Sequence, residues 1–75
     1  MASLIRSVVF KEHVSGEENG TFTVSMRYEL GRECGHLAGT DMETVILNDH
    51  DGGRVYEVAR RLCEVHGCEF IRIKE

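Results

Sequence analysis

The sequence predicts an α+β fold: a mostly antiparallel four-stranded sheet in the order β-β-β-α-β, with one amphipathic helix packed on one face. Two patterns carry this prediction. Apolar and polar residues alternate over 21–30, TFTVSMRYEL, which is typical of a half-buried antiparallel strand. Over 55–66 the apolar residues recur instead at helical spacing, which indicates a helix with one buried side.

The first strand is expected over residues 3–14, SLIRSVVFKEHV, which are β-branched and apolar. Apolar side chains occur in both alternation phases, so this strand should be central in the sheet. The pattern does not decide which of the two sets of side chains faces the helix. The turn-forming run SGEENG, 15–20, predicts a hairpin loop that leads into the second strand.

The segment 31–41, GRECGHLAGTD, has three glycines and no period, and is expected to be a loop before a third strand at 42–48. The helix should then start with Asp51 as its N-cap and end with Gly67 as its C-cap. Its apolar side is expected to hold, among others, Val55, Val58, Ala59, Leu62 and Val65.

A fourth strand is expected at 68–74, CEFIRIK. A right-handed crossover through the helix would place it parallel to the first strand and give the order 4-1-2-3. The sheet face opposite the helix should then carry Phe70 and either Phe10 or Val9, as an apolar strip for a partner or a second copy. The alternative is that these are scattered surface residues, which are common.

Size and composition indicate one globular domain, residues 1–75. The 75 residues are 41% hydrophobic and 29% charged, which fits an ordered domain rather than a disordered chain. No apolar run reaches the ~18 residues of a membrane helix, and the N-terminal stretch lacks the features of a signal peptide. We therefore expect a cytoplasmic protein with no membrane association.

The net charge of −4 favours a protein partner over nucleic acid. Phosphate neutralisation supplies most nucleic-acid affinity, whereas an acidic domain suits a basic protein surface. The alternative is that the acidic residues only keep the domain soluble. The candidate partner-binding residues are Glu17, Glu18, Glu29, Glu33 and Phe70.

The segment RLCEVHGC, 61–68, raises the question of a metal site. Cys63 and His66 lie one helical turn apart and Cys68 just follows, while ECGH supplies Cys34 and His36. Together they could form the four-ligand set of a structural zinc. The spacing does not match a standard zinc motif, however, and it also fits a helix end in which Cys63 acts as a small hydrophobe. The main prediction therefore includes no cofactor, with zinc as the alternative.

Two other segments contain residue types that occur in phosphate, metal or catalytic sites. In NDHDGG, 48–53, the carboxylates of Asp49 and Asp51 would repel a phosphate and are too few to hold Mg²⁺ or Ca²⁺. Cys34 and His36 are two positions apart, but nothing in the sequence orients them for nucleophilic catalysis. The absence of any recognisable constellation predicts that the protein is not an enzyme.

The hairpin ENGTFTVSM, 18–26, together with the β-β-β-α order, resembles the N-terminal domain of HicB-type antitoxins. The resemblance covers about half of the chain, the loop lengths differ, and no residue assignment is transferred. It implies a small protein that inhibits or docks on another protein.

The sequence therefore predicts a small non-enzymatic protein-binding or inhibitor protein. Our hypothesis is that it is phage- or mobile-element-encoded and acts on a nucleic-acid-handling complex through its acidic surface or a sheet edge. A second copy forming a homodimer is another candidate occupant of such an edge. The alternatives are a zinc-stabilised module and a nucleic-acid-binding domain that uses its sheet face.

Overall fold

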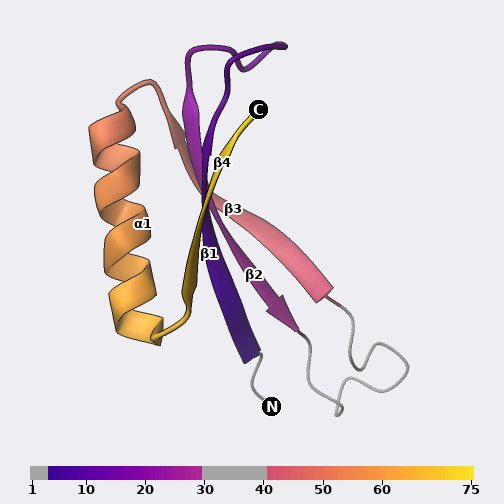
Figure 1. The fold of residues 1–75 in the computed structure, drawn as a ribbon, viewed down its shortest axis with the longest axis vertical. Helices are drawn as coiled ribbons and strands as arrows, with labels where there is room; N and C mark the ends of the chain where they lie inside the picture. Colours follow the sequence, from indigo (N-terminus) through magenta and orange to yellow (C-terminus); the bar gives the residue numbers. More distant parts are fainter. Residues whose placement is uncertain (1–3, 30–40) are drawn as a thin grey trace.

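Four strands form one mixed sheet and a single helix covers one face of it in the computed structural model, which describes residues 4–29 and 41–75 (Figure 1). The predicted α+β class and element order are confirmed. The predicted loop at 31–41 lies outside the described residues except for Asp41. The elements are β1 (Leu4–Glu12), β2 (Phe22–Glu29), β3 (Asp41–Asp49), α1 (Gly52–His66) and β4 (Glu69–Lys74).

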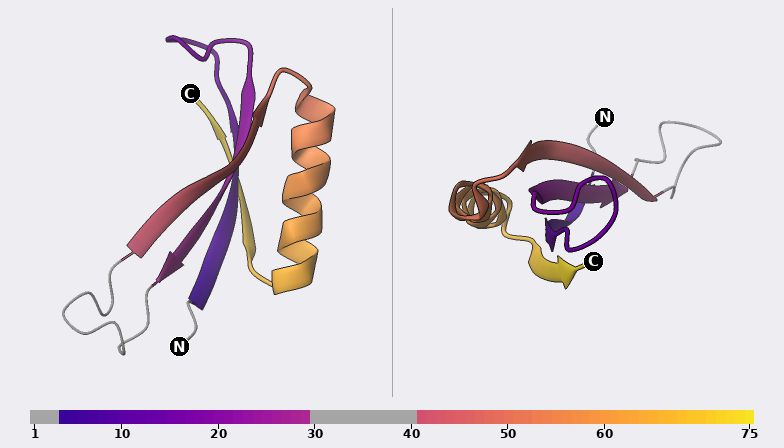
Figure 2. Two further views of the ribbon diagram at one scale, coloured as in Figure 1. Left: turned by 180° about the vertical axis from the view of Figure 1, so that it is seen from behind. Right: turned by 90° about the horizontal axis from the view of Figure 1, so that it is seen from above.

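The strand order is β3-β2-β1-β4, which confirms the predicted topology (Figure 2). β1 pairs antiparallel with β2 and parallel with β4, and β2 pairs antiparallel with β3. α1 connects β3, at one edge of the sheet, to β4, at the other edge. A connection of this kind between parallel strands requires a crossover rather than a tight turn, and it places β4 beside β1. β1 is therefore central, as expected, while β3 and β4 form the two edges.

Both predicted caps of α1 are confirmed. The Asp51 carboxylate accepts a hydrogen bond from the backbone N–H of Arg54 at 3.2 Å and so satisfies a free donor of the first turn. At the other end Gly67 adopts a left-handed conformation, with φ 63°, and its N–H donates to the carbonyl of Cys63 at 2.8 Å. A residue with a Cβ would be strained at this position, which explains the glycine.

The core lies between α1 and the two central strands. Val8 and Phe10 of β1 and Val24 of β2 are buried against Val55 and Ala59 of the helix. Small side chains on the helix allow its backbone to approach the sheet closely. Partly buried apolar residues surround this cluster: Phe22, Met26, Leu47, Tyr56, Val58, Leu62, Cys63, Cys68 and Phe70.

Four aromatic rings contact one another in series, from β2 through β1 and α1 to β4. Phe10 stacks on Phe22 with centroids 5.9 Å apart and meets Tyr56 edge-on at 5.4 Å. Tyr56 also contacts Phe70 edge-on at 5.7 Å, and the guanidinium of Arg72 lies 5.3 Å from the Tyr56 ring centre. Such ring pairs and the cation–π contact each add to the burial of apolar area.

Two expectations about faces are wrong. Phe70 was expected on the face opposite the helix, but its contact with Tyr56 places it on the helix side of β4. Val65 was expected among the buried residues of α1, but it is 71% exposed because it lies at the margin of the apolar stripe in the last turn. The sequence left open whether Phe10 or Val9 lies on the face opposite the helix. Val8 and Phe10 face the helix, so Val9 lies on the opposite face.

Within the described part of the chain, no helix combines the length and the apolar character needed to cross a lipid bilayer.

We predict that Gly52→Ala destabilises the fold. A Cβ on Gly52 would lie 2.8 Å from two atoms of the Phe22 ring, which is held by its stack on Phe10. Relieving this overlap should lower the free energy of unfolding by about 1–3 kcal/mol. Urea denaturation followed by circular dichroism measures the change.

The matched control is Gly53→Ala, whose Cβ would meet only the Asp51 carboxylate, at an ordinary contact distance of 3.5 Å. This change should leave stability unaltered or raise it by up to about 1 kcal/mol, because alanine has less freedom in the unfolded chain. Equal effects of the two substitutions would contradict close approach at Gly52.

Candidate protein-binding surface

The sheet face opposite α1, here called the open face, contains buried side chains although no described helix or strand covers it. The strand registers align Val45, Ser25, Val9 and Ile71 in one row across all four strands. Val9 is 0% exposed and Ser25 is 1% exposed. The middle of this row is therefore shielded from solvent by other parts of the chain.

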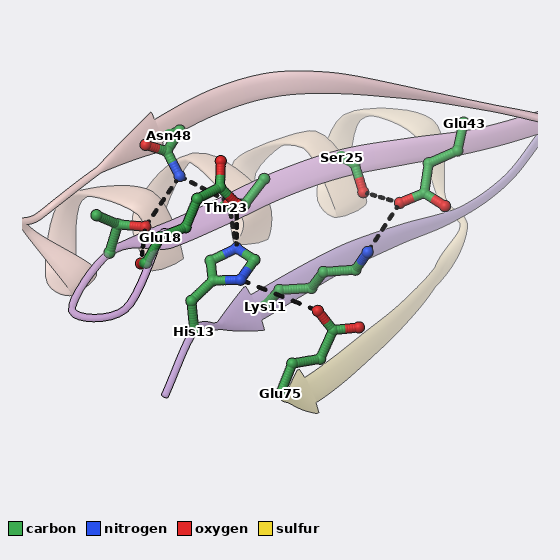
Figure 3. A network of polar contacts seen from close by, with 9 residues as sticks. Lys11, His13, Glu18, Thr23, Ser25, Glu43, Asn48 and Glu75 are labelled. Carbon is green, nitrogen blue, oxygen red and sulfur yellow. Dashed lines mark hydrogen bonds and ion pairs between the residues drawn. The ribbon is translucent and has the colours of Figure 1, made fainter. Parts of the chain in front are cut away.

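An ion pair between Lys11 and Glu43 spans this row beside Ser25 (Figure 3). Lys11 lies in the next row on one side of the row of Val9 and Ser25, and Glu43 lies in the next row on the other side. The Lys11 ammonium and the Glu43 carboxylate are 3.5 Å apart. The hydroxyl of Ser25 donates to the same carboxylate at 2.7 Å, and Arg27 lies 3.5 Å from its other oxygen. The Lys11 stem and the Glu43 carboxylate thus close over Ser25.

These contacts also shift the titration of Glu43. The hydrogen bond from Ser25, assisted by the charges of Lys11 and Arg27, outweighs partial burial and lowers the pKa of Glu43 below its ordinary value of 4.5. The carboxylate is consequently ionised at neutral pH, which the ion pairs require.

A second polar cluster joins the hairpin loop, β2, β3 and the C-terminus (Figure 3). The His13 Nε2 atom lies 2.7 Å from the Thr23 hydroxyl, which also accepts a hydrogen bond from the Asn48 amide at 2.8 Å. Carboxylates of Glu18 and Glu75 lie 3.6 and 3.9 Å from the two ring nitrogens. No buried side-chain nitrogen or oxygen in the described residues lacks a hydrogen-bond partner, so the polar groups of the open face bond to one another.

A shallow hollow of about 710 Å³ lies at the end of the open face where β1 and β4 begin. It offers two guanidinium and two carboxylate groups, so its formal charge balances and selects no anion or cation. The lining residues are Ile5, Arg6, Ser7, Arg27, Met42, Glu43, Glu69 and Ile71.

In the described part of the chain, the edge strand β3 carries three of the five large hydrophobic residues that are exposed. Met42, Val45 and Ile46 are 41%, 61% and 45% exposed, and only Val14 and Val65 are comparable large exposed hydrophobics there. The edge of a sheet also presents backbone N–H and C=O groups without a neighbouring strand. A β-bulge at Ile46 gives β3 one residue more than its partner β2.

The acidic candidates fall into two groups at opposite ends of β3. Glu17 and Glu18 lie in the exposed hairpin loop that leads into β2, whose first residue pairs with Asp49. Glu29, at the other end of β2, pairs with Asp41. The strand between the two groups spans about 25 Å, so they do not form one patch. Glu33 lies outside the described residues.

The residues considered for zinc are not gathered into a ligand set in the described part of the chain. No group of three or more His, Cys, Asp or Glu side chains in residues 4–29 and 41–75 is placed to hold a metal. The Cys63 thiol donates to the backbone carbonyl of Cys68 at 2.8 Å, and His66 is exposed. Burial, assisted by the nearby Cys63, raises the pKa of the Cys68 thiol. Cys34 and His36 lie outside the described residues.

Sequence reasoning missed two features of the surface: the exposed apolar residues of β3 and the ion pair between Lys11 and Glu43. The exposed residues of β3 had a readable signal, because METVIL carries apolar residues in both alternation phases and the predicted order makes this strand an edge. The bridge from Lys11 to Glu43 had none, because the two residues are far apart in sequence and belong to non-adjacent strands.

Comparison of the chain with protein-family models, with curated proteins and with solved structures gave no match.

We predict that Glu43→Gln lowers the free energy of unfolding by about 0.5–1 kcal/mol near neutral pH, because it removes two ion pairs but keeps an acceptor for Ser25. Since folding lowers the pKa of Glu43, its stabilisation is present above pH 4.5 and is lost as pH falls through the lowered value. Wild type and variant should therefore converge in acid. Urea denaturation at a series of pH values tests this.

Glu64→Gln is the control, because Glu64 forms an exposed ion pair with Arg60 on the outer side of α1, at 3.3 Å. It should cost less at neutral pH, since solvent screens that pair. A constant difference between wild type and Glu43→Gln at all pH values would contradict the role assigned to the carboxylate.

Proposed function

We propose that this chain is a small non-enzymatic protein-binding module that docks through the free edge of β3, where a strand of the partner extends the sheet. The observation that supports this most is the exposure of Met42, Val45 and Ile46 on a nine-residue edge strand. Backbone hydrogen bonds along such an edge supply affinity, and the exposed side chains supply selectivity.

The other sheet edge is less suited to this role. β4 has six residues, and Glu69, Arg72 and Lys74 give it both signs of charge along its exposed positions. Short, charged edge strands are a common means of preventing strand addition. β3 lacks this protection in its middle, so a partner strand has more apolar area to cover there.

The open face and the outer side of the helix are also less suited. Hydrogen bonds and ion pairs on the open face already join its polar groups, and a partner would have to replace them without loss. On α1 the exposed pair of Arg60 and Glu64 is typical of a solvated helix surface.

The charges near β3 suit a partner with a basic surface, such as one that ordinarily holds nucleic acid. Glu17 and Glu18 extend the acidic surroundings of Asp49 at one end of the strand. Covering such a surface would inhibit the partner, in keeping with the inhibitor role proposed from the sequence. The free thiols of Cys63 and Cys68 suit the reducing conditions of a cytoplasm, where we place the interaction.

We predict that the double substitution Val45→Ser and Ile46→Ser weakens partner binding at least tenfold, because it removes two exposed apolar contacts from the edge. Ligands would first be selected with the wild-type protein from a library of displayed protein fragments. Their dissociation constants for both proteins would then be measured by fluorescence anisotropy.

The matched control is Val65→Ser, which alters an even more exposed valine on α1, away from the sheet edge. It should leave affinity unchanged. Selected ligands that bind the β3 double variant as tightly as wild type would overturn the proposed function. Circular dichroism would verify that each variant remains folded.

A further inference from the structure

The turn between α1 and β4 brings two thiols together at the sheet edge opposite β3. We propose that Cys63 and Cys68 are a redox modification site, at which a reversible intramolecular disulfide fastens the end of α1 to the start of β4. This inference goes beyond the proposed function and does not rest on it, because docking at β3 involves neither cysteine.

The backbone of the turn explains why two residues five positions apart meet. Gly67 adopts a left-handed conformation and its N–H donates to the carbonyl of Cys63, so the chain reverses direction at the end of α1 (Figure 1). At helix ends of this kind, the residue after the glycine commonly packs against the residue four positions before the glycine. Here those two residues are Cys68 and Cys63.

The side chains make the contact that this backbone favours. The Cys63 Sγ atom donates to the backbone carbonyl of Cys68 at 2.8 Å, and the two thiols are close enough to interact electrostatically. Both side chains border the core cluster under α1. A disulfide forms between cysteines whose side chains the backbone already directs toward each other, and this turn provides that arrangement.

Both thiols lie where a small reagent reaches them. Each cysteine is only partly buried, and residues 64–67, which separate them, are all exposed. Oxidised glutathione can therefore approach the turn while the rest of α1 stays packed on the sheet.

The reaction is thiol–disulfide exchange with oxidised glutathione. One protein thiolate attacks a glutathione sulfur, which breaks the glutathione S–S bond, forms a mixed disulfide and releases one reduced glutathione. The second protein thiolate then attacks the protein sulfur of the mixed disulfide, forms the Cys63–Cys68 bond and releases the second reduced glutathione. The protein thiols lose two electrons and two protons, and the two glutathione sulfurs gain them.

The energetics of the turn favour the disulfide. Oxidation removes the hydrogen bond from the Cys63 thiol to the Cys68 carbonyl, but a thiol is a weak donor, so little is lost. Burial raises the pKa of the Cys68 thiol, so the reduced form gains no stabilisation from a thiolate there. The cross-link also restricts the unfolded chain, which stabilises the folded state.

The test uses the intact protein and the Cys34→Ser variant, which lacks the third cysteine of the chain. Both are equilibrated with mixtures of reduced and oxidised glutathione, and the remaining thiols are then alkylated. Mass spectrometry should find a monomer in which Cys63 and Cys68 carry neither alkyl group nor glutathione and have together lost two hydrogen atoms. Peptide mapping should join Cys63 to Cys68 in both proteins.

Folding should promote this oxidation. Its equilibrium constant should be at least tenfold larger for the folded protein than in concentrated urea, because the cross-link costs the unfolded chain entropy that the folded chain has already lost. By the same linkage, the oxidised protein should melt about 5–10 °C above the reduced protein.

Cys63→Ala and Cys68→Ala are the matched variants, and each keeps a small apolar side chain in the turn. Either substitution should abolish the loss of two hydrogen atoms and the rise in melting temperature, and the remaining thiol should carry glutathione instead. Circular dichroism would verify that each variant remains folded, and the two variants serve as checks on each other.

Three results would overturn the proposal. The first is separate glutathione adducts on Cys63 and Cys68 of the folded wild-type protein. The second is a disulfide to Cys34 or to a second copy of the chain in place of the intramolecular one. The third is an oxidation equilibrium that is the same in urea as in the folded protein, because the turn would then contribute nothing. Each would leave the two cysteines as small apolar side chains of a helix end.

Discussion

The structure depends on the burial of β1 from both sides. Val8 and Phe10 pack under α1, while Val9 is fully buried on the reverse face, where the ion pair of Lys11 and Glu43 joins the two neighbouring rows. A small domain with one helix can cover only one sheet face with secondary structure, so the other face needs side chains to exclude water. Long charged side chains achieve this because their aliphatic stems cover apolar atoms while their heads stay solvated and paired.

This arrangement explains why the sequence predicted the fold so well. Strand β2 alternates apolar residues that face α1 with polar residues on the open face, and this alternation predicted the strand directly, although Thr23 and Ser25 of the polar face are themselves buried rather than solvated. The caps at Asp51 and Gly67 are local signals that depend only on neighbouring backbone geometry. Connection rules then favour the observed topology, because a helical crossover between parallel strands of one sheet is right-handed in nearly all known folds.

The failures have a common physical origin, since local pattern cannot say which long-range contacts form. β4 has an apolar residue in each phase, and only the contact of Phe70 with Tyr56 decides which phase meets the helix. On the open face, Lys11 and Glu43 form an ion pair between strands that are not neighbours, which no local pattern indicates. Glu17 and Glu18 lie in the hairpin loop and Glu29 ends β2, and their separation at opposite ends of β3 becomes visible only with the β2–β3 register.

An exposed apolar edge is a hazard for a soluble domain unless something limits what it accepts. Here two features of β3 limit what it can accept: the bulge at Ile46 breaks a flat pairing surface, and the apolar stretch is short. Neither feature closes the edge. β4 differs, because its six residues carry the charged side chains of Glu69, Arg72 and Lys74, and such charges discourage the addition of another strand. The two edges of this sheet are therefore not equivalent, and the proposed strand addition is expected at β3 alone.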